Sequence, residues 1–412
     1  MKEISSQARK KAIRITSLLI HLDNYMKLSL ILIVLIHTLF ISQTTAQVKN
    51  DEVITIPIKE AIDEGKNNLT LSSFVEDDIE YIQLETNAFC PINKNLRLFL
   101  NDTVIIAIAQ KQIFLFERNT GKFIREIGHV GKDPHGYSET IFSKPYSESK
   151  NTILTRGWLP NSFMEYDLSG KFISKRILLS SETIRDALNF NDGTTIAYVW
   201  NLEGKNKKKL MVFNADGKEI SSFPQNRSFE YDMNKHGIDV LHWEGWFYSF
   251  KNQINFYELS TDTIYAITPE RLKPRYVLSY GKYQVPYELR NTKKFYSNHS
   301  EYYFINSLYE SKRYLFFTFI CDKNYYTGIY DKSAALTKVS QEVENDIDNF
   351  VSFQISSINK DEEIIGYQLT HKVKEWLQKH PEKEKEFSSK VKNFNGVNIY
   401  YNPIIMIGKL KR

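Results

Sequence analysis

The strongest constraint on the fold is a sequence motif that occurs three times at a nearly constant interval. In each copy an aromatic residue ends an apolar stretch, polar turn-forming residues follow, and a glycine and a lysine lead into another strand. The copies lie at residues 116–124, 166–173 and 213–220, with glycines at 121, 170 and 217. The intervals of 49 and 47 residues correspond to one four-stranded propeller blade and are too long for common helical repeats.

Each copy of the motif predicts a β-hairpin. The residues before the turn are apolar, as in 113–116 and 210–213. The turns contain Asn, Asp, Ser and Gly, which accept positive φ angles. We therefore expect the hairpins to join the outer strands of successive blades. Fainter copies follow at 256–265 and 328–332.

Composition agrees with an all-β fold. Aromatic residues make up 14% of the chain, with 26 Phe and 25 Tyr, whereas Gly and Pro are sparse. A propeller grows by radial repetition without enlarging any single core. We predict a six-bladed β-propeller of four-stranded antiparallel blades over residues 47–412. The first strand, 53–58, is expected to close the ring by pairing into the last blade, because an open ring leaves unpaired strand edges.

The N-terminal segment has the pattern of a secretory signal peptide. An apolar run over residues 28–41 follows Met26 and Lys27, and the small residues Thr44 and Ala46 end the segment. Because small residues stand at these two positions, we expect cleavage after Ala46. The apolar run is also too short for a typical membrane span. Met26 begins a complete signal peptide by itself, so residues 1–25 are interpreted as a gene-model extension. A long charged leader or a retained anchor is the alternative.

Removal of residues 1–46 also removes most of the excess positive charge. This segment holds six of the 54 basic and two of the 49 acidic side chains, so the remainder carries a net charge of +1. Such a balance gives no support to nucleic-acid binding. The signal peptide predicts an exported protein, periplasmic or extracellular, with no membrane span after cleavage. No cysteine stands directly after the apolar run, so the acceptor residue of a lipoprotein is missing and we expect that the protein is not a lipoprotein.

The two cysteines leave two interpretations open. Cys90 and Cys321 are 231 residues apart, and the sequence does not place their Cα atoms within bridging distance. In an exported protein they form either a disulfide or two free thiols.

One segment breaks the β pattern. Residues 371–394 are rich in charged helix formers and carry apolar residues at helical spacing. We predict one or two helices inserted before the last strand, interrupted at Pro381. They are expected to cover the final blade, and an exposed helical surface for a partner is the alternative.

A glycine-rich loop supplies the first candidate site. Residues 127–137 contain three glycines and a proline, together with His129, Asp133 and His135. Imidazole and carboxylate groups are suitable ligands for zinc and similar ions. The spacing matches no established metal signature, so a structural turn with polar side chains is the competing interpretation.

Tryptophans supply the second candidate site. Trp158 precedes a proline turn, and Trp243 and Trp246 flank a glycine. Aromatic rings near turns stack well on a sugar or peptide. Packing between blades is the alternative for each of them.

Four segments together resemble a known group of proteins. Residues 81–86, the glycine-rich stretch 121–137, residues 262–265 and the closing stretch 402–411 are similar to the secreted six-bladed propellers of the Bacteroides type, which are related in shape to NHL-repeat propellers. The resemblance implies the fold and export, but no particular activity. This chain departs from the many lipoprotein members in lacking the acceptor cysteine, and in having His135 before the last glycine of the loop.

The sequence contains no nucleophile elbow, zinc-protease helix, phosphate-binding loop or EF-hand. The favoured hypothesis is an exported cell-envelope protein that binds a peptide, glycan or protein partner with one loop face of the propeller. The alternative is a metal-assisted lyase or hydrolase at the central channel, because propellers draw site residues from distant repeats. A structural or sensory domain that assembles with a partner is a third hypothesis. No cofactor is predicted, and a divalent metal is left open.

Overall fold

The computed structural model describes residues 53–64, 68–92, 96–140, 142–230, 244–290, 301–386, 389–392, 394 and 396–412. The predicted signal peptide, the proposed start at Met26 and the candidate Trp243 lie outside these residues. The chain separates into two units, Met1–Val53 and Ile54–Arg412. The fold described below is that of the second unit.

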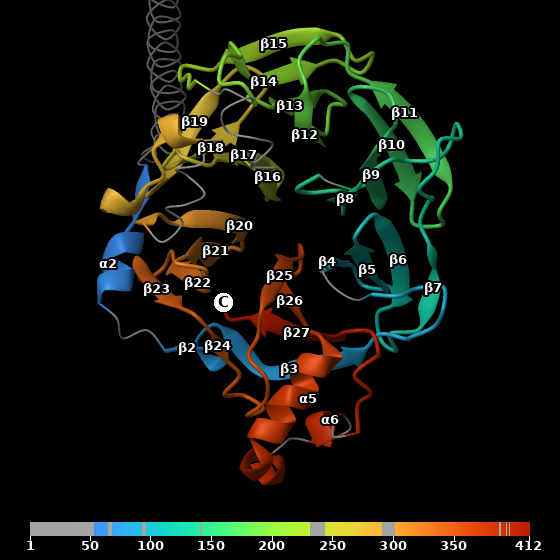
Figure 1. Cartoon of the computed structure of the whole chain (residues 1–412), viewed down its shortest axis with the longest axis vertical. Coiled ribbons are helices and arrows are strands. Elements are labelled where there is room, and N and C mark those ends of the chain that lie inside the picture. The colour runs from blue at the N-terminus through green and yellow to red at the C-terminus, as the bar shows by residue number, and fades with distance from the viewer. Residues whose placement is uncertain are drawn as a thin grey trace, which may run out of the picture. The chain divides into compact units, whose positions relative to one another are not determined.

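Six antiparallel sheets surround a central axis and form the predicted six-bladed propeller (Figure 1). Five blades have four strands, and the fourth blade gains a fifth, β1. The first three blades are β4–β7 (Leu96–Leu100, Val104–Ala109, Gln112–Glu117, Phe123–Glu126), β8–β11 (Tyr146–Ser147, Thr152–Arg156, Ser162–Asp167, Phe172–Ile177) and β12–β15 (Ile184–Asn189, Thr195–Val199, Lys208–Phe213, Glu219–Pro224). The others are β16–β19 (Gly245–Phe250, Gln253–Glu258, Thr263–Ile267, Leu272–Leu278) with β1 (Ile54–Ile56), β20–β23 (Phe304–Glu310, Tyr314–Cys321, Asn324–Asp331, Leu336–Ser340), and β25–β27 (Ile355–Ile358, Glu363–Gln368, Ile404–Leu410) with β3 (Val75–Gln83).

The hydrophobic core lies mainly between the faces of neighbouring blades. Ile106 and Leu115 of the first blade, for example, pack in one buried cluster with Met164 and Tyr166 of the second. Alternation along each strand allows one blade to present apolar side chains to both of its neighbours.

The repeated motif forms hairpins, as predicted. In the first three blades it joins the third strand to the fourth, and its glycines have φ angles of 68°, 84° and 78°. A Cβ atom at Gly121 would lie 2.3 Å from the carbonyl oxygen of Gln83, and one at Gly217 would lie 2.0 Å from that of Ile177. Both carbonyls belong to the preceding blade. Glycine therefore allows the turn to adopt positive φ and also to touch the neighbouring blade.

The prediction that residues 53–58 close the ring is wrong. The strand β1 pairs in parallel with β19 of the fourth blade. Ring closure is made by β3, which pairs with the C-terminal strand β27. In β3, Val75 and Ile79 are fully buried, whereas Ile54 of β1 is 37% exposed. Ile56 of β1 is also fully buried, so β1 adds a core residue beside the fourth blade while β3 completes the sixth.

Between these two strands the chain passes the fifth blade. It forms the short helix α2 (Ile58–Asp63), the strand β2 (Leu69–Thr70) and the 3-10 turn η1 (Leu71–Ser73). The strand β2 pairs in parallel with β24 (Val343–Glu344). Two further 3-10 turns, η2 (Gly281–Tyr283) and η3 (Tyr287–Leu289), follow the fourth blade.

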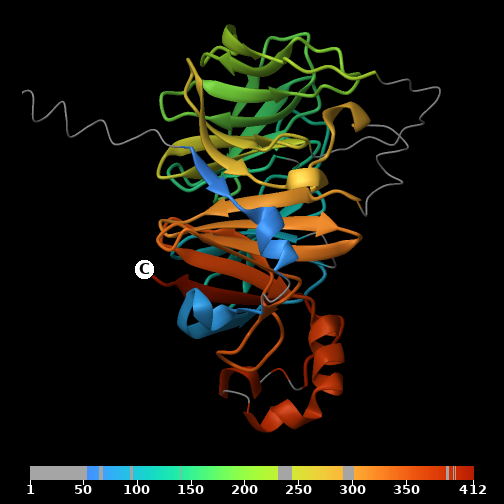
Figure 2. The same ribbon diagram turned by 90° about the vertical axis from the view of Figure 1, so that its left-hand side faces the viewer.

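The predicted helical insertion lies between β26 and β27 (Figures 1 and 2). It consists of α5 (Thr370–Lys379), the 3-10 helix η5 (Pro381–Glu386) and α6 (Ser389–Lys392). Helix α5 ends just before Pro381, as the proline predicted. Val373 and Val391 are fully buried in the cluster that contains Val75 of β3, so the insertion covers the final blade.

Cys90 and Cys321 are free thiols in this structure. Cys90 is buried in a cluster with first-blade residues, and Cys321 ends β21 in the fifth blade. In the described part of the chain, no helix is long and apolar enough to span a bilayer.

Candidate functional site

Two adjoining cavities, of about 330 and 610 Å³, lie along the channel at the centre of the ring. The smaller is lined by turns that join the first and second strands of several blades, and the larger by innermost strands and the segments that lead into them. The residues common to both cavities are Lys144, Glu148, Ser249, Glu310 and Ile358. These side chains therefore lie where the cavities meet.

Residues 142–148, here called the channel segment, connect the second blade to four others. The Arg97 guanidinium of the first blade donates to the carbonyl of Phe142, and Ser143 bonds to the carboxylate of Asp186 in the third. Ser143 and Lys144 contact the fourth blade, and Glu148 contacts the sixth. These bonds hold the segment, which includes the short strand β8, beside the channel.

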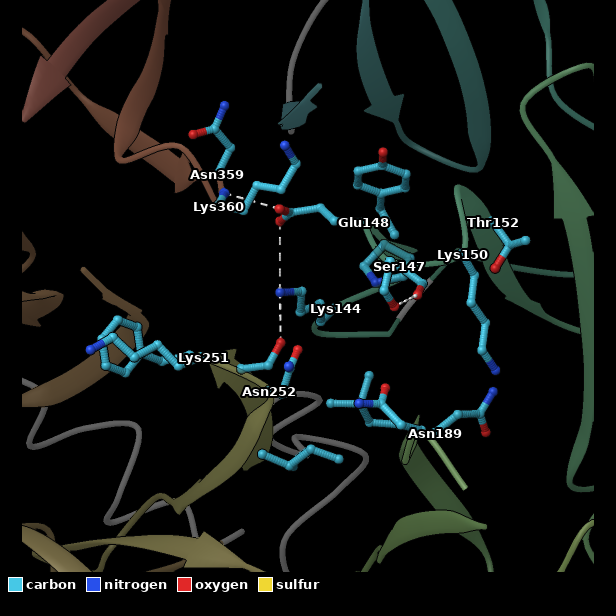
Figure 3. A pocket seen from close by; sticks show the side chains of 18 of the residues that line it. Lys144, Ser147, Glu148, Lys150, Thr152, Asn189, Lys251, Asn252, Asn359 and Lys360 are labelled. Atoms are coloured by element: carbon cyan, nitrogen blue, oxygen red, sulfur yellow. Dashed lines mark hydrogen bonds and ion pairs between the residues drawn. The ribbon is translucent and has the colours of Figure 1, made fainter. Parts of the chain in front are cut away.

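The two charged side chains of the channel segment are Lys144 and Glu148 (Figure 3). The Lys144 ammonium donates to Ser249 Oγ of the fourth blade at 2.6 Å and lies 3.9 Å from Glu148 Oε1. Glu148 Oε2 accepts a 2.9 Å bond from the backbone N–H of Lys360 in the sixth blade. Burial lowers the pKa of Lys144, and the nearby Glu148 carboxylate only partly offsets this effect.

Asp186, a residue of β12, anchors the channel segment through its bonds with Ser143. It is 4% exposed and accepts a 2.9 Å bond from the N–H of Ala187. Burial nevertheless raises the pKa of Asp186 to about 6, since the bonds from Ser143 and the backbone offset only part of the desolvation. Burial likewise lowers the pKa of Arg97 to about 10.

Glu310 is a fully paired anion on the opposite wall. Its side chain has no exposed surface, and Arg275 binds it in a bidentate pair at 2.5 and 2.6 Å. Lys332 adds a 2.6 Å ion pair, and Tyr276 donates at 2.9 Å. This carboxylate is held in place by protein donors, and its charge is compensated within the wall.

The predicted metal-site residues lie outside the channel, on the connection from the first blade to the second. His129 Nε2 is 2.6 Å from Asp133 Oδ2, and both side chains are about half exposed. The His135 ring instead stacks on Phe172 at 4.6 Å. Within the described ranges, no three His, Cys, Asp or Glu side chains gather as a set of metal ligands.

The predicted aromatic site is divided between two environments. Trp158 is 48% exposed, and its indole N–H donates to the carbonyl of Gly131, so it lies beside the loop that carries His129. Trp246 is 7% exposed and packs edge-on against Tyr257 at 5.0 Å. It also contributes to the wall of the larger cavity.

Sequence reasoning missed the channel segment. Lys144 and Glu148 belong to no motif, and their partners Ser249 and Lys360 are more than 100 residues away along the chain. A short segment at the start of a blade carries no local signal for a central position.

The family described as a domain of unknown function, DUF4934, matches residues 53–409, which is nearly the whole propeller. The chain belongs to the DUF4934 family. The matched range includes the channel segment and the residues that line both cavities.

A solved structure of another protein has the same fold as this chain. A candidate exported protein from Bacteroides fragilis aligns with a TM-score of 0.65 at 16% identity, covering 88% of this chain and 100% of that one. The virginiamycin B lyase of Staphylococcus aureus aligns with a TM-score of only 0.36 at 10% identity, covering 70% and 81%. The first likeness shows the fold, and the second carries no argument about activity. No curated protein matches the chain at a significant level.

Proposed function

We propose that this protein is an exported binding protein of the cell envelope that holds its ligand at the central channel of the propeller. The ligand is a peptide, a glycan or an exposed part of an envelope protein, bound from the face where the strand-connecting turns surround the channel. Export is supported by the signal-peptide pattern before Gln47 and by the similarity to the Bacteroides fragilis protein.

The observation that carries the proposal is the pair of cavities on either side of the channel segment. Their volumes of about 330 and 610 Å³ lie in the range of small-molecule sites. The wall of the larger cavity combines apolar side chains with a few charged groups, which is the usual composition of a ligand pocket, whereas the smaller cavity has a more highly charged wall. Lys144 and Glu148 are positioned by bonds to distant blades, so their charged groups are pre-organised for a ligand.

The proposal is tested by filling the cavities. Residues 47–412 are screened against envelope glycans and peptides, and binding is then measured for Ser149→Trp in the smaller cavity and Asn306→Trp in the larger. Both side chains are exposed to their cavity, so the substitutions add volume without removing core packing. Ile220→Trp, on an exposed outer strand, is the matched control.

We expect at least one cavity variant to lose binding while the control retains it. A ligand that binds all three variants equally well would place recognition elsewhere on the protein. Elemental analysis of the same preparation, made without an affinity metal, addresses the metal-assisted lyase or hydrolase. A stoichiometric ion whose removal lowers the melting temperature would favour that alternative.

A further inference from the structure

Four blades place a lysine in the same structural position at one end of the channel. Lys150, Lys251, Lys312 and Lys360 lie at or beside the turns that join the first strand of a blade to its second. All four side chains are exposed, and all line the 330 Å³ cavity. Figure 3 labels Lys150, Lys251 and Lys360. The corresponding turns of the other two blades contain Asp102 and Asp192, and neither lines this cavity.

The four carboxylates that line the same cavity already accept bonds from protein donors. Glu310 is paired with Arg275 and Lys332, as described above. Glu165 Oε1 accepts a 2.7 Å bond from Thr152 Oγ1, and the backbone N–H of Lys312 donates to Glu362 at 2.9 Å. Glu148 accepts from the Lys360 backbone. Their negative charge is therefore partly compensated.

Lys150, Lys251, Lys312 and Lys360 are here called the mouth lysines. The positive charge of their ammonium groups is less compensated by neighbouring carboxylates. Within the described residues, Lys150, Lys251 and Lys312 make no ion pair with a carboxylate, whereas Lys360 pairs with the exposed Asp361 at 2.9 Å. Deeper in the cavity, the Lys144 ammonium has its closest carboxylate oxygen at 3.9 Å. A ligand that enters between the mouth lysines reaches Lys144 next. The smaller cavity thus offers cations at its rim and one at its base.

We propose that the ligand is an acidic glycan or sugar derivative whose carboxylate or phosphate groups lie between the mouth lysines and Lys144. This inference rests on the proposed channel function and specifies its ligand chemistry. The volume of about 330 Å³ suits a molecule of sugar-acid or sugar-phosphate size. An anion placed beside Lys144 also replaces part of the solvation that this ammonium loses on burial.

Isothermal titration calorimetry of residues 47–412 tests the inference with three defined probes. Glucuronic acid supplies a carboxylate, glucose 6-phosphate supplies a phosphate, and glucose is the neutral control. The test variant is Lys251→Gln/Lys312→Gln. The matched control is Lys175→Gln/Lys218→Gln, which removes the same charge from exposed positions of the second and third blades that do not line the cavity.

We expect at least one anion to bind more tightly than glucose, with a Kd that rises with salt. The test variant is expected to weaken this binding by about tenfold or more, and the control to leave it nearly unchanged. The arm that binds identifies the acidic group. Absence of binding by both anions, or equal binding by the two lysine variants, overturns the inference.

Failure of the inference is distinguishable from failure of the proposed function. If a neutral glycan or peptide from the screen loses binding in Ser149→Trp or Asn306→Trp, the channel binds a ligand but the ligand is not anionic. If anions bind and neither tryptophan variant affects them, the lysines act outside the cavities and both proposals fail.

Discussion

Lys144 of the second blade donates a 2.6 Å hydrogen bond to Ser249 of the fourth blade, although the third blade lies between them in the ring. The bond crosses the channel and therefore couples blades that share no strand pairing. Nearby, the backbone N–H of Phe247 donates to Ser143 Oγ at 3.0 Å, so two adjacent residues of the channel segment bind the same strand, β16.

The Lys144–Ser249 bond predicts a non-additive mutant cycle. Ser249→Ala leaves the largely buried ammonium without its closest acceptor, and we expect the free energy of unfolding to fall by about 1–3 kcal/mol. Lys144→Met in the same background removes the buried charge and is expected to restore most of the loss. Urea unfolding of all four proteins measures the coupling. Effects that add within about 0.5 kcal/mol would contradict a direct interaction.

Asp186 predicts a pH dependence of stability with a defined sign. Its pKa of about 6 in the folded state exceeds the usual 3.8, so the folded chain binds this proton more tightly than the unfolded chain. The resulting stabilisation is complete below about pH 4 and is lost as the pH rises to about 6.

The corresponding variant is Asp186→Asn, which keeps an acceptor for the N–H of Ala187 but does not ionise. Relative to the parent protein, its free energy of unfolding is expected to be higher at pH 7 than at pH 4 by on the order of 2 kcal/mol. Asp192→Asn, on an exposed turn, is the control. A difference between Asp186→Asn and the parent that is constant with pH would refute the assignment.

Ring closure by β3 predicts unequal costs for two isoleucines near the N-terminus. Ile79→Ala removes a fully buried side chain from the closing strand and is expected to cost about 2–5 kcal/mol. Ile54→Ala, in β1 and 37% exposed, is expected to cost less than about 1 kcal/mol. Chemical denaturation measures both. A larger cost at Ile54 would mean that β1, and not β3, is the critical N-terminal strand.

The hairpin motif predicts a difference between two glycines with similar φ angles. Gly121→Ala adds a Cβ that meets the Gln83 carbonyl oxygen at 2.3 Å, whereas Gly193 has open space within 4 Å. Gly193→Ala therefore pays only the cost of positive φ, about 1 kcal/mol. Gly121→Ala is expected to cost clearly more, by thermal unfolding. Equal losses would show that the contact between blades is unimportant.

The signal-peptide interpretation predicts a mature chain that begins at Gln47. Intact-mass measurement of the exported protein tests the cleavage position directly. Ala46→Leu places a bulky residue at the cleavage site and is expected to leave the precursor unprocessed, because the peptidase requires a small residue there. An N-terminus other than Gln47 in the parent protein would refute this position.

Much of the fold was predictable because its signals are local. The turn around Gly121 is encoded by residues that accept positive φ next to apolar strands, and the same pattern returns at the next two blades. The insertion was predictable for the same reason, since helix formers and Pro381 act on neighbouring residues.

The closing strand was not predictable in this way. Residues 53–58 and 75–83 are both N-terminal segments with apolar side chains, and local pattern does not say which one pairs with β27. The choice depends on the apolar contacts that each segment makes with blades encoded hundreds of residues later. In β3 those contacts place Val75 and Ile79 in one buried cluster with Met406 of β27.

By itself the sequence determined the blade repeat, the hairpin turns, the inserted helices and the expectation of export. Only the tertiary structure placed Lys144 and Glu148 inside the channel and the mouth lysines around one cavity. The physical reason is that a propeller channel is assembled from one short piece of every blade. Each piece has an ordinary sequence, and its charged residues form a common site only when the folded ring brings the pieces together.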